Sequence, residues 1–247
     1  MKKQRGFIAE FLVVMVQATI IALVVRSFLF QSFNIPSGSL VPTLLVGDYV
    51  FVSKYAYGYS KHSFPFSFVN FAGRVLGSDP KRGDIAVFHN DKDMGKDYIK
   101  RVIGLPNDSI QMRDGVLFIN DVAVKKERIG TFETDKPDRI MRKVPQYRET
   151  LPNGVSYTTI EIESGRGYLS HTGVFNVPAG HYFMMGDNRE DSQDSRVPSK
   201  VGFVPIENFI GRAEMVYFSA DTGEQRGVFA VLNPSNIRWD RVFGRVK

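Results

Sequence analysis

The apolar run from Phe7 to Val25 constrains this chain more than any other feature of its sequence. At about 1.5 Å per residue, a helix over this run would span roughly 28 Å, close to the hydrocarbon thickness of a bilayer. We therefore expect one transmembrane helix at residues 7–25. A cleavable signal peptide is the alternative, because it has a similar basic start, but its apolar region is usually only about 7–15 residues long.

The placement of basic residues predicts how this helix is oriented. Three basic residues lie within the first six positions, whereas Arg26 is the only basic residue between the apolar run and Lys54. Cytoplasmic flanks of membrane helices carry an excess of Lys and Arg. We therefore expect residues 1–6 in the cytoplasm and residues 26–247 on the outer side.

Composition limits what the outer part can be. Its length of about 220 residues is sufficient for one substantial core. The chain has no Cys, which excludes disulfides, thiolate metal sites and a cysteine nucleophile. A net charge of +6 suits contact with anionic membrane lipid, but there is no Lys/Arg block or RNA-binding motif, so we expect no nucleic acid partner.

Hydrophobicity in the outer part alternates with period two, and Gly, Pro, Asn and Asp punctuate it frequently. We therefore expect a mostly β fold, an antiparallel barrel or sandwich, with an inserted β-rich subdomain at about 120–178. The predicted strands are residues 48–54, 84–89, 98–103, 109–112, 116–119, 157–163, 182–185 and 212–218.

Four polar clusters could carry chemistry: the turn at residues 37–44, Lys54, residues 97–101 and residues 186–196. By spacing alone, Ser39 is most simply a turn residue. Lys54 is most simply a solvated charge at the end of a strand.

Lys100 is different, because Tyr98, Ile99, Val102 and Ile103 surround it in a strand-like run. Burial lowers the pKa of a lysine, and a neutral amine can act as a general base near neutral pH. From the residues alone, a paired or snorkelling lysine is the simpler interpretation.

Histidine chemistry has little support in the sequence. His62, His89, His171 and His181 are scattered, and none has zinc-ligand spacing. A Ser/His/Asp triad stays an alternative, since its members can be far apart in the chain. We expect no metal and no cofactor.

Together, residues 37–48, 81–88, 97–108 and 186–196 resemble the motifs of bacterial type I signal peptidases, in order and in approximate spacing. The resemblance covers nearly the whole chain, including the membrane segment. It implies a single-pass enzyme of the bacterial cytoplasmic membrane with an outer catalytic domain. Its implied activity is removal of signal peptides from secreted preproteins after small residues of the Ala-x-Ala type, through an acyl-enzyme on a serine/lysine dyad.

The resemblance also implies a role for individual residues. Ser39 matches the nucleophile and Lys100 its general base, while the Ser37 hydroxyl and the Ser39 backbone N–H match the oxyanion hole. Ser192 matches the serine that orients the lysine. The residues expected to line the substrate pockets are Phe33, Ile35, Leu44, Tyr98 and Ile99. The residues expected to brace the site are Arg101, Asp187, Asp194 and Arg196.

Three positions depart from the family's pattern. Leu40 replaces the usual Met, a volume-conserving change that should be mild. Asn107 replaces Gly in a turn, where Asn tolerates a left-handed backbone. Glu190 and Asp191 replace the commoner Asp-Asn before Ser192, which affects the expected placement of that serine.

Secretory preproteins and membrane lipid are the expected partners, and we expect a monomer. Phe64, Phe66 and Phe68 alternate ahead of Phe71, so this segment either buries one aromatic face or dips into the membrane interface. The rival interpretation of the whole chain is a membrane-anchored β-domain that binds or scaffolds without chemistry. A second rival is a Ser/His hydrolase acting on envelope substrates.

Overall fold

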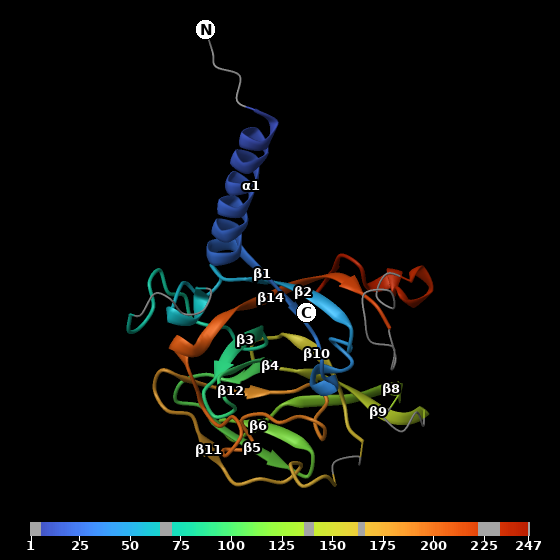
Figure 1. Ribbon diagram of the computed structural model, residues 1–247. Helices are drawn as coiled ribbons and strands as arrows, with labels where there is room; N and C mark the ends of the chain where they lie inside the picture. The colour runs from blue at the N-terminus through green and yellow to red at the C-terminus, as the bar shows by residue number, and fades with distance from the viewer. Residues whose placement is uncertain (1–5, 65–70, 136–140, 163–165, 222–232, 247) are drawn as a thin grey trace.

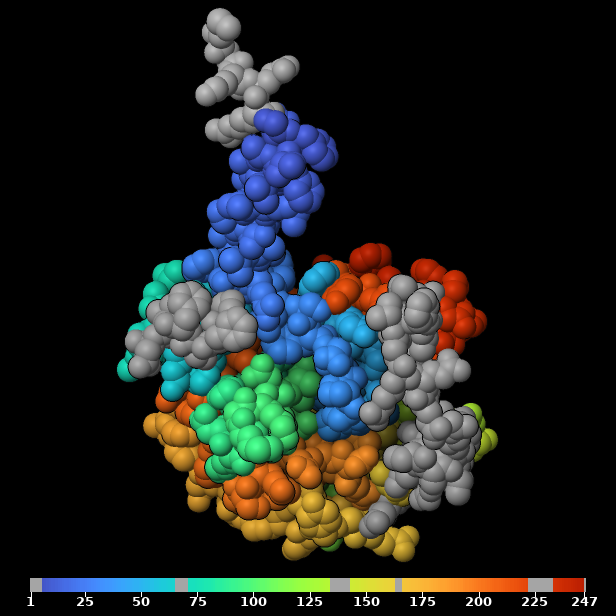
Figure 2. Space-filling view, in the orientation of Figure 1, coloured from blue at the N-terminus to red at the C-terminus, as the bar shows by residue number. Residues whose placement is uncertain are grey.

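The computed structural model describes residues 6–64, 71–135, 141–162, 166–221 and 233–246. Helix α1 (Phe7–Val24) projects from a β-rich body, and none of its residues is buried. A π-helical turn (Val25–Leu29) extends it to a 23-residue apolar segment, long enough to cross a membrane. The space-filling view shows how far it stands clear of the body (Figures 1 and 2). This exposed apolar helix is compatible with a membrane anchor.

The body is built on one large antiparallel sheet with strand order β1-β2-β14-β3-β4-β12-β13, and β15 pairs with β14 (Figure 1). The prediction of a mostly β, antiparallel fold is confirmed. The strands of this sheet are β1 (Phe30–Asn34), β2 (Asp48–Ser53), β3 (Ile85–Asn90), β4 (Lys96–Gly104), β12 (His181–Met185), β13 (Val204–Pro205), β14 (Phe209–Ser219) and β15 (Gly244–Arg245).

Two smaller sheets complete the β structure, with strand orders β11-β5-β6-β7 and β10-β9-β8. Their strands are β5 (Ser109–Arg113), β6 (Val116–Ile119), β7 (Val122–Ala123), β8 (Lys125–Asp135), β9 (Met141–Thr150), β10 (Ser156–Ile160) and β11 (Phe175–Asn176). Short 3-10 turns cover Gly38–Leu40, Lys61–Ser63, Ile206–Asn208, Pro234–Asn236 and Trp239–Arg241. The sheet of β8, β9 and β10 falls within the expected insertion at 120–178, whose limits as a subdomain stay a prediction.

The predicted β5–β6 hairpin turns at Asp114 and Gly115, which both have positive φ. This backbone twist matches a tight antiparallel hairpin, and it explains why an Asp-Gly pair stands there. The sequence analysis missed β1 and the long β8–β9 hairpin. The predicted strand at 157–163 ends earlier, at Ile160.

The middle of the large sheet is buried on both faces, as β3 shows. One apolar cluster includes Val50, Ile85 and Val87, and another includes Ala86 and Phe88. Successive residues of β3 therefore enter opposite cores, so this strand is continuously apolar rather than alternating.

Candidate active site

Two segments far apart in the sequence meet at Ser39 and Lys100. Ser39 lies in the 3-10 turn after β1, and Lys100 lies in β4. Their side chains are in hydrogen-bond contact, with 2.6 Å between Lys100 Nζ and Ser39 Oγ. Ser39 is 7% exposed and Lys100 is 5% exposed. The hydroxyl and the amine therefore form an isolated pair with little access to bulk water.

Burial gives this amine an unusual acidity. Desolvation lowers the pKa of Lys100 to about 8, against an opposing effect of the carboxylates of Asp194 and Asp187. At pH 7 this makes about a tenth of the amine neutral, compared with well under ~0.1% for an ordinary lysine. Nζ also lies 5.5 Å from the ring centroid of Tyr98. A neutral Lys100 can accept the proton of the Ser39 hydroxyl.

The turn that carries the nucleophile is held by the segment after β12. The backbone N–H of Asn188 donates to the Ser39 carbonyl at 3.1 Å, and its side-chain amide donates to the Gly38 carbonyl at 3.1 Å. A Cβ on Gly186 would lie 2.4 Å from the Ser39 carbonyl oxygen and 2.2 Å from Ser192 Oγ. Only glycine permits this close approach. Sequence reasoning did not single out Asn188, whose role depends on this contact.

The two other predicted serines lie on either side of the pair. Ser37 is exposed, with its Oγ 3.4 Å from Ser39 Oγ. Ser192 is buried, and its hydroxyl lies near Asp194, where it helps to lower the pKa of that carboxyl, but it makes no hydrogen bond to Lys100 among the described residues. The oxyanion role of Ser37 and the orienting role of Ser192 stay predictions.

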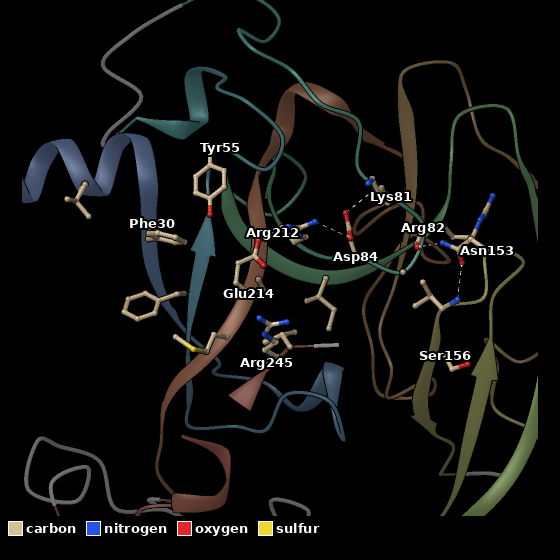
Figure 3. Close-up of a pocket in the computed structure, with 18 residues that line it drawn as sticks. Phe30, Tyr55, Lys81, Arg82, Asp84, Asn153, Ser156, Arg212, Glu214 and Arg245 are labelled. Atoms are coloured by element: carbon tan, nitrogen blue, oxygen red, sulfur yellow. Dashed lines mark hydrogen bonds and ion pairs between the residues drawn. The ribbon is translucent and has the colours of Figure 1, made fainter. Parts of the chain in front are cut away.

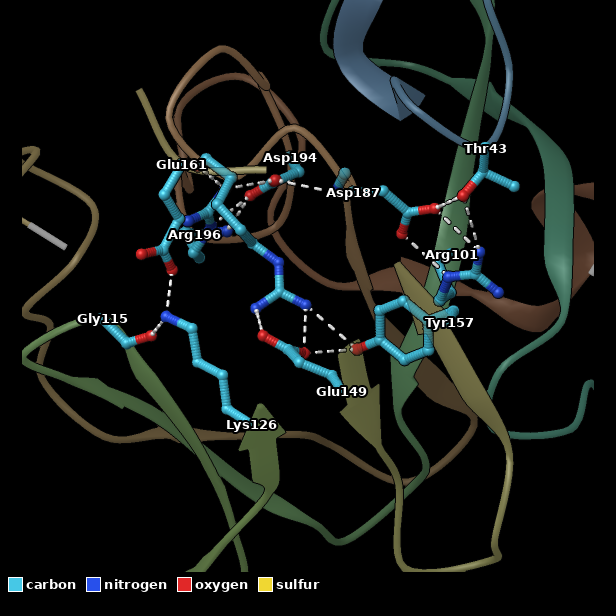
Figure 4. A network of polar contacts seen from close by, with 12 residues as sticks. Thr43, Arg101, Gly115, Lys126, Glu149, Tyr157, Glu161, Asp187, Asp194 and Arg196 are labelled. Carbon is cyan, nitrogen blue, oxygen red and sulfur yellow. Dashed lines mark hydrogen bonds and ion pairs between the residues drawn. The ribbon is translucent and has the colours of Figure 1, made fainter. Parts of the chain in front are cut away.

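Arg101 and Asp187 form a buried, two-pronged ion pair beneath the site (Figure 4). Arg101 Nε donates to Asp187 Oδ1 at 2.8 Å, and a terminal nitrogen donates to Oδ2 at 2.7 Å. The Thr43 hydroxyl donates to the same carboxylate at 2.5 Å. Asp187 thus ties the segment after the nucleophile to the strand that carries Lys100.

Asp194 and Arg196 form a second buried pair in the same loop. The Arg196 guanidinium donates twice to Asp194, at 2.9 and 2.7 Å, its backbone N–H donates at 3.2 Å, and the Gly186 N–H donates to the same carboxylate at 3.0 Å. Burial alone would raise the pKa of Asp194, but the charge and hydrogen bonds of Arg196 outweigh this and hold the pKa low. The carboxylate therefore stays ionised and fixes Gly186 against the nucleophile turn.

A third buried ion pair was not predicted from the sequence. Arg189 binds Glu149 of β9 through two hydrogen bonds of 2.7 and 2.5 Å, and the Tyr157 hydroxyl donates to Glu149 at 2.7 Å. Lys126 and Glu161 pair nearby (Figure 4). The Arg189–Glu149 pair joins the three-stranded sheet to the site loop. The two residues are forty positions apart, so no local sequence pattern predicts their contact.

Four of the five predicted pocket residues lie in one apolar cluster next to the nucleophile. Ile35 and Leu44 are buried there, and Phe33 and Ile99 pack against the same cluster. Tyr98 instead packs against the cluster on the other face of the sheet, beside the Lys100 amine.

The departures from the family's pattern fit their surroundings. Leu40 is buried in the apolar cluster that includes Ile35. Asn107 has a φ of 69°, the left-handed conformation that the usual glycine would supply. Glu190 approaches Gly167, whose N–H donates to its carboxylate at 3.3 Å.

The expectation that Lys54 is a solvated charge was wrong. This residue is 1% exposed, and its amine donates to the carbonyl oxygen of Ser63. Burial, followed by the nearby Arg26 charge, lowers the pKa of Lys54 to about 8. The turn that covers Lys54 follows it by only nine residues but lies outside its strand, so the strand pattern could not reveal the burial.

A groove of about 1170 Å³ lies outside the dyad and is lined by neither Ser39 nor Lys100. Its apolar end includes Val25 and Phe30, next to the membrane helix. Figure 3 shows Arg212 and Arg245 in the same groove, with Glu214 beside Arg212. The groove thus combines an apolar entrance with basic side chains.

Comparisons with known proteins show which family this chain is similar to. The family model described as "Signal peptidase, peptidase S26" matches residues 8–218. A signal peptidase I of Rickettsia typhi is 45% identical over 206 residues, covering 81% of this chain and 76% of its own length. That of Rickettsia conorii is 44% identical, covering 81% and 75%. A crystal structure of a signal peptidase I from Enterococcus faecalis is 28% identical, covers 55% of this chain and 97% of its own, and has a TM-score of 0.31.

Proposed function

Because this chain belongs to the signal peptidase family, peptidase S26, and is a serine peptidase that removes signal peptides, we propose that Ser39 and Lys100 perform its chemistry. The observation that carries the proposal is the 2.6 Å contact between the Ser39 hydroxyl and a buried amine of lowered pKa. A serine hydroxyl is a weak nucleophile until an adjacent base accepts its proton. Lys100 can serve as this base because burial favours its neutral form.

In the proposed first step, Ser39 Oγ attacks the carbonyl carbon of the scissile peptide bond as its proton moves to Lys100 Nζ. The oxyanion that forms is held by the Ser39 N–H and the Ser37 hydroxyl. The tetrahedral intermediate then collapses, the C–N bond breaks, and Lys100 returns the proton to the leaving amine. The signal peptide stays attached to Ser39 as an ester.

In the second step, neutral Lys100 takes a proton from water, and the resulting nucleophile attacks the ester. Collapse releases the signal peptide as a carboxylic acid and returns the proton from Lys100 to Ser39 Oγ. The positions of Asp187 and Asp194 suit them to hold the loop, since both are committed to arginine partners. Ser192 is proposed to orient the lysine when substrate is bound.

Preference for small side chains of the Ala-x-Ala type is also part of the proposal. Ile35, Leu44, Phe33 and Ile99 belong to one apolar cluster beside Ser39, and they are proposed to line shallow pockets for the substrate's side chains. A methyl group suits such a site better than a large side chain, which would have to displace packed residues.

The helix α1 supports the proposed arrangement at the membrane, with the N-terminus in the cytoplasm and the body outside in a bacterial cytoplasmic membrane. The groove beside Val25 is proposed to take an anionic phospholipid, whose charge complements Arg245, since Arg212 already pairs with Glu214 in the same groove. We keep the expectation of a monomer. Since the chain lacks Cys, single cysteines at Lys3 and at the exposed Tyr168 can report orientation. A membrane-impermeant thiol reagent should label only Tyr168→Cys in intact spheroplasts, and labelling of Lys3→Cys alone would reverse the orientation.

The decisive experiment incubates the detergent-purified protein with a precursor whose signal ends in Ala-x-Ala. The parent, Ser39→Ala and Lys100→Met are compared, and mass spectrometry locates the cut. Cleavage after the motif by the parent alone is the expected result. A His-dependent hydrolase would instead lose activity on replacement of a histidine, and a scaffold would cleave nothing although all three proteins are folded. Cleavage by all three proteins would move the active site elsewhere.

A further inference from the structure

Two of the four histidines that are scattered in the sequence meet beside Asp91. His62 lies in the turn Lys61–Ser63 and His89 lies in β3, and their rings stack with centroids 4.2 Å apart. One ring nitrogen of each histidine and one carboxylate oxygen of Asp91 all lie within 4.8 Å of one another. The three side chains thus offer one potential ligand atom each to a common point.

The hydrogen bonding of the two rings leaves nitrogen lone pairs free. Nε2 of His62 is buried and has no partner among the described residues. A buried polar atom left in this state has lost its hydration without gaining a hydrogen bond, so it calls for a ligand or a partner. Nδ1 of His89 lies 3.2 Å from Asp97 Oδ1, which favours the proton on Nδ1 and leaves the Nε2 lone pair available.

The carboxylate of Asp91 is held in place from behind. Asn208 Nδ2 donates to Asp91 Oδ2 at 2.9 Å and to the His89 carbonyl at 3.0 Å. Asp91 Oδ1 lies 3.7 Å from His89 Nε2, on the open side of the cluster. Metal ligands are usually oriented by hydrogen-bond partners in an outer layer. Asp97 is such a partner for His89, and Asn208 is one for Asp91.

We propose that His62, His89 and Asp91 form a zinc site that is separate from the dyad. Two imidazole nitrogens and one carboxylate oxygen match a preferred donor set of Zn²⁺, with water as the fourth ligand. At bond lengths near 2.1 Å, tetrahedral ligand atoms lie roughly 3.4 Å apart, so the 3.7 Å separation is already close to what zinc requires. The ligand atoms lie within 4.8 Å of one another, and the wider gaps close when the His62 ring rotates out of its stack with His89.

The surrounding charges are balanced. Lys61 and Arg74 act on His62 as nearby cations, while Asp91 and Asp97 supply two negative charges at His89. The bound ion would fasten the turn at 61–63 to the end of β3. Its role would be to stabilise the fold next to the strand that carries the proposed base. The inference does not depend on the dyad chemistry.

The test uses the full-length chain in detergent, purified through a tag without histidine and stripped with a chelator. Titration calorimetry with ZnCl₂ should show one zinc per chain, with Mg²⁺ giving no heat of binding. The melting temperature should rise with zinc, since a ligand that binds only the folded state stabilises it.

Variants identify the ligands. His62→Gln and His89→Gln should each abolish binding at this site. Asp97→Asn should weaken binding by about 10–100-fold, as expected for an outer-layer partner. His181→Gln is the matched control, since His181 contacts the Ala179 carbonyl away from the cluster and its replacement should change nothing.

Melting in chelator shows whether each variant is folded before zinc is added. If a histidine variant does not fold, Asp91→Asn tests the same site through an exposed side chain of nearly unchanged shape. The proposal is overturned if the parent binds no more zinc than the folded ligand variants. Equal loss in His181→Gln, or unchanged affinity in both Asp91→Asn and Asp97→Asn, would also overturn it.

Discussion

Two lysines of this protein share burial and acidity but differ in what their amines face. Lys100 and Lys54 are both nearly inaccessible, and burial is the main cause that lowers the pKa of each to about 8. The amine of Lys100 contacts the Ser39 hydroxyl, whereas the amine of Lys54 donates to the Ser63 carbonyl. A carbonyl oxygen has no proton to give. A lowered pKa therefore points to a general base only where a proton donor adjoins the amine.

The largest expected difference between the two lysines is in activity. Lys100→Met should reduce the rate of precursor cleavage by at least about 10⁴-fold, as loss of a catalytic-group member does in serine proteases. Lys54→Met should stay within about tenfold of the parent, because its amine contacts no reacting group. Single-turnover cleavage assays measure both. Comparable losses of cleavage rate in the two variants would contradict a catalytic role for Lys100 alone.

The tight packing of Gly186 against Ser39 and Ser192, next to Lys100, can be tested by substitution. Gly186→Ala should lower the rate by about 10²-fold or more, because its Cβ would displace the Ser39 carbonyl or Ser192. Gly173→Ala is the control, since nothing lies within 4 Å of a Cβ there. The cleavage rates of the two folded variants are compared with that of the parent. Full activity of Gly186→Ala would show that the turn of Ser39 tolerates displacement.

Stability offers a third contrast. For Lys100 the folded pKa lies below the unfolded one, so the unfolded chain binds more protons between about pH 8 and 10.5, and stability rises with pH across that window. Below about pH 8, Lys100→Met should therefore stabilise the fold by up to about 3 kcal/mol. Above about pH 10.5 this gain in stability should vanish. Each variant loses one buried hydrogen bond. The Ser39 hydroxyl still has Ser37 Oγ at 3.4 Å, whereas the Ser63 carbonyl loses the amine of Lys54, so Lys54→Met should gain less.

Denaturant unfolding at pH 7 and near pH 11 measures these gains. A stabilisation by Lys100→Met that is the same at both pH values would mean that its cause is packing and not the buried charge.

The smallest expected effect is the pH dependence of cleavage. The active form requires neutral Lys100, so kcat/KM should rise with pH and level off above a midpoint near 8. Between pH 7 and 9 the increase should be about tenfold, because the neutral fraction rises by that amount. Lys54→Met should keep the same midpoint. A flat profile in the parent, or a midpoint displaced in Lys54→Met, would assign the titration to another group.

The sequence predicted the mostly β fold because the period of two in β2, β5 and β6 reflects which face of each strand is buried. It missed β1, since five residues next to a membrane helix show no separate pattern. It also missed the β8–β9 hairpin, in which many outward-facing charges mask the strand period. There the pairing of the two strands with each other, not local propensity, makes the structure.

The candidate site shows a similar division. Ser39 and Lys100 were identified through motifs that resemble those of a family, and the structure brings them together. Arg189 and Glu149 carry no such motif, and only the fold shows that they pair. The meeting of His62 and His89 was equally invisible, because the turn at 61–63 reaches β3 only in three dimensions.

The short connection between α1 and the nucleophile has a consequence for how cleavage sites are chosen. The π-helical turn leads directly into β1, which pairs with β2 along its full length and ends just before the turn of Ser39. Residues 35–37 alone separate β1 from that turn, and the N–H of Ile35 donates to the Asp48 carbonyl at 2.8 Å. With α1 in the membrane as proposed, the Ser39 hydroxyl would lie at a fixed distance from the bilayer surface. A small residue of the precursor would then be cut only where it reaches that distance.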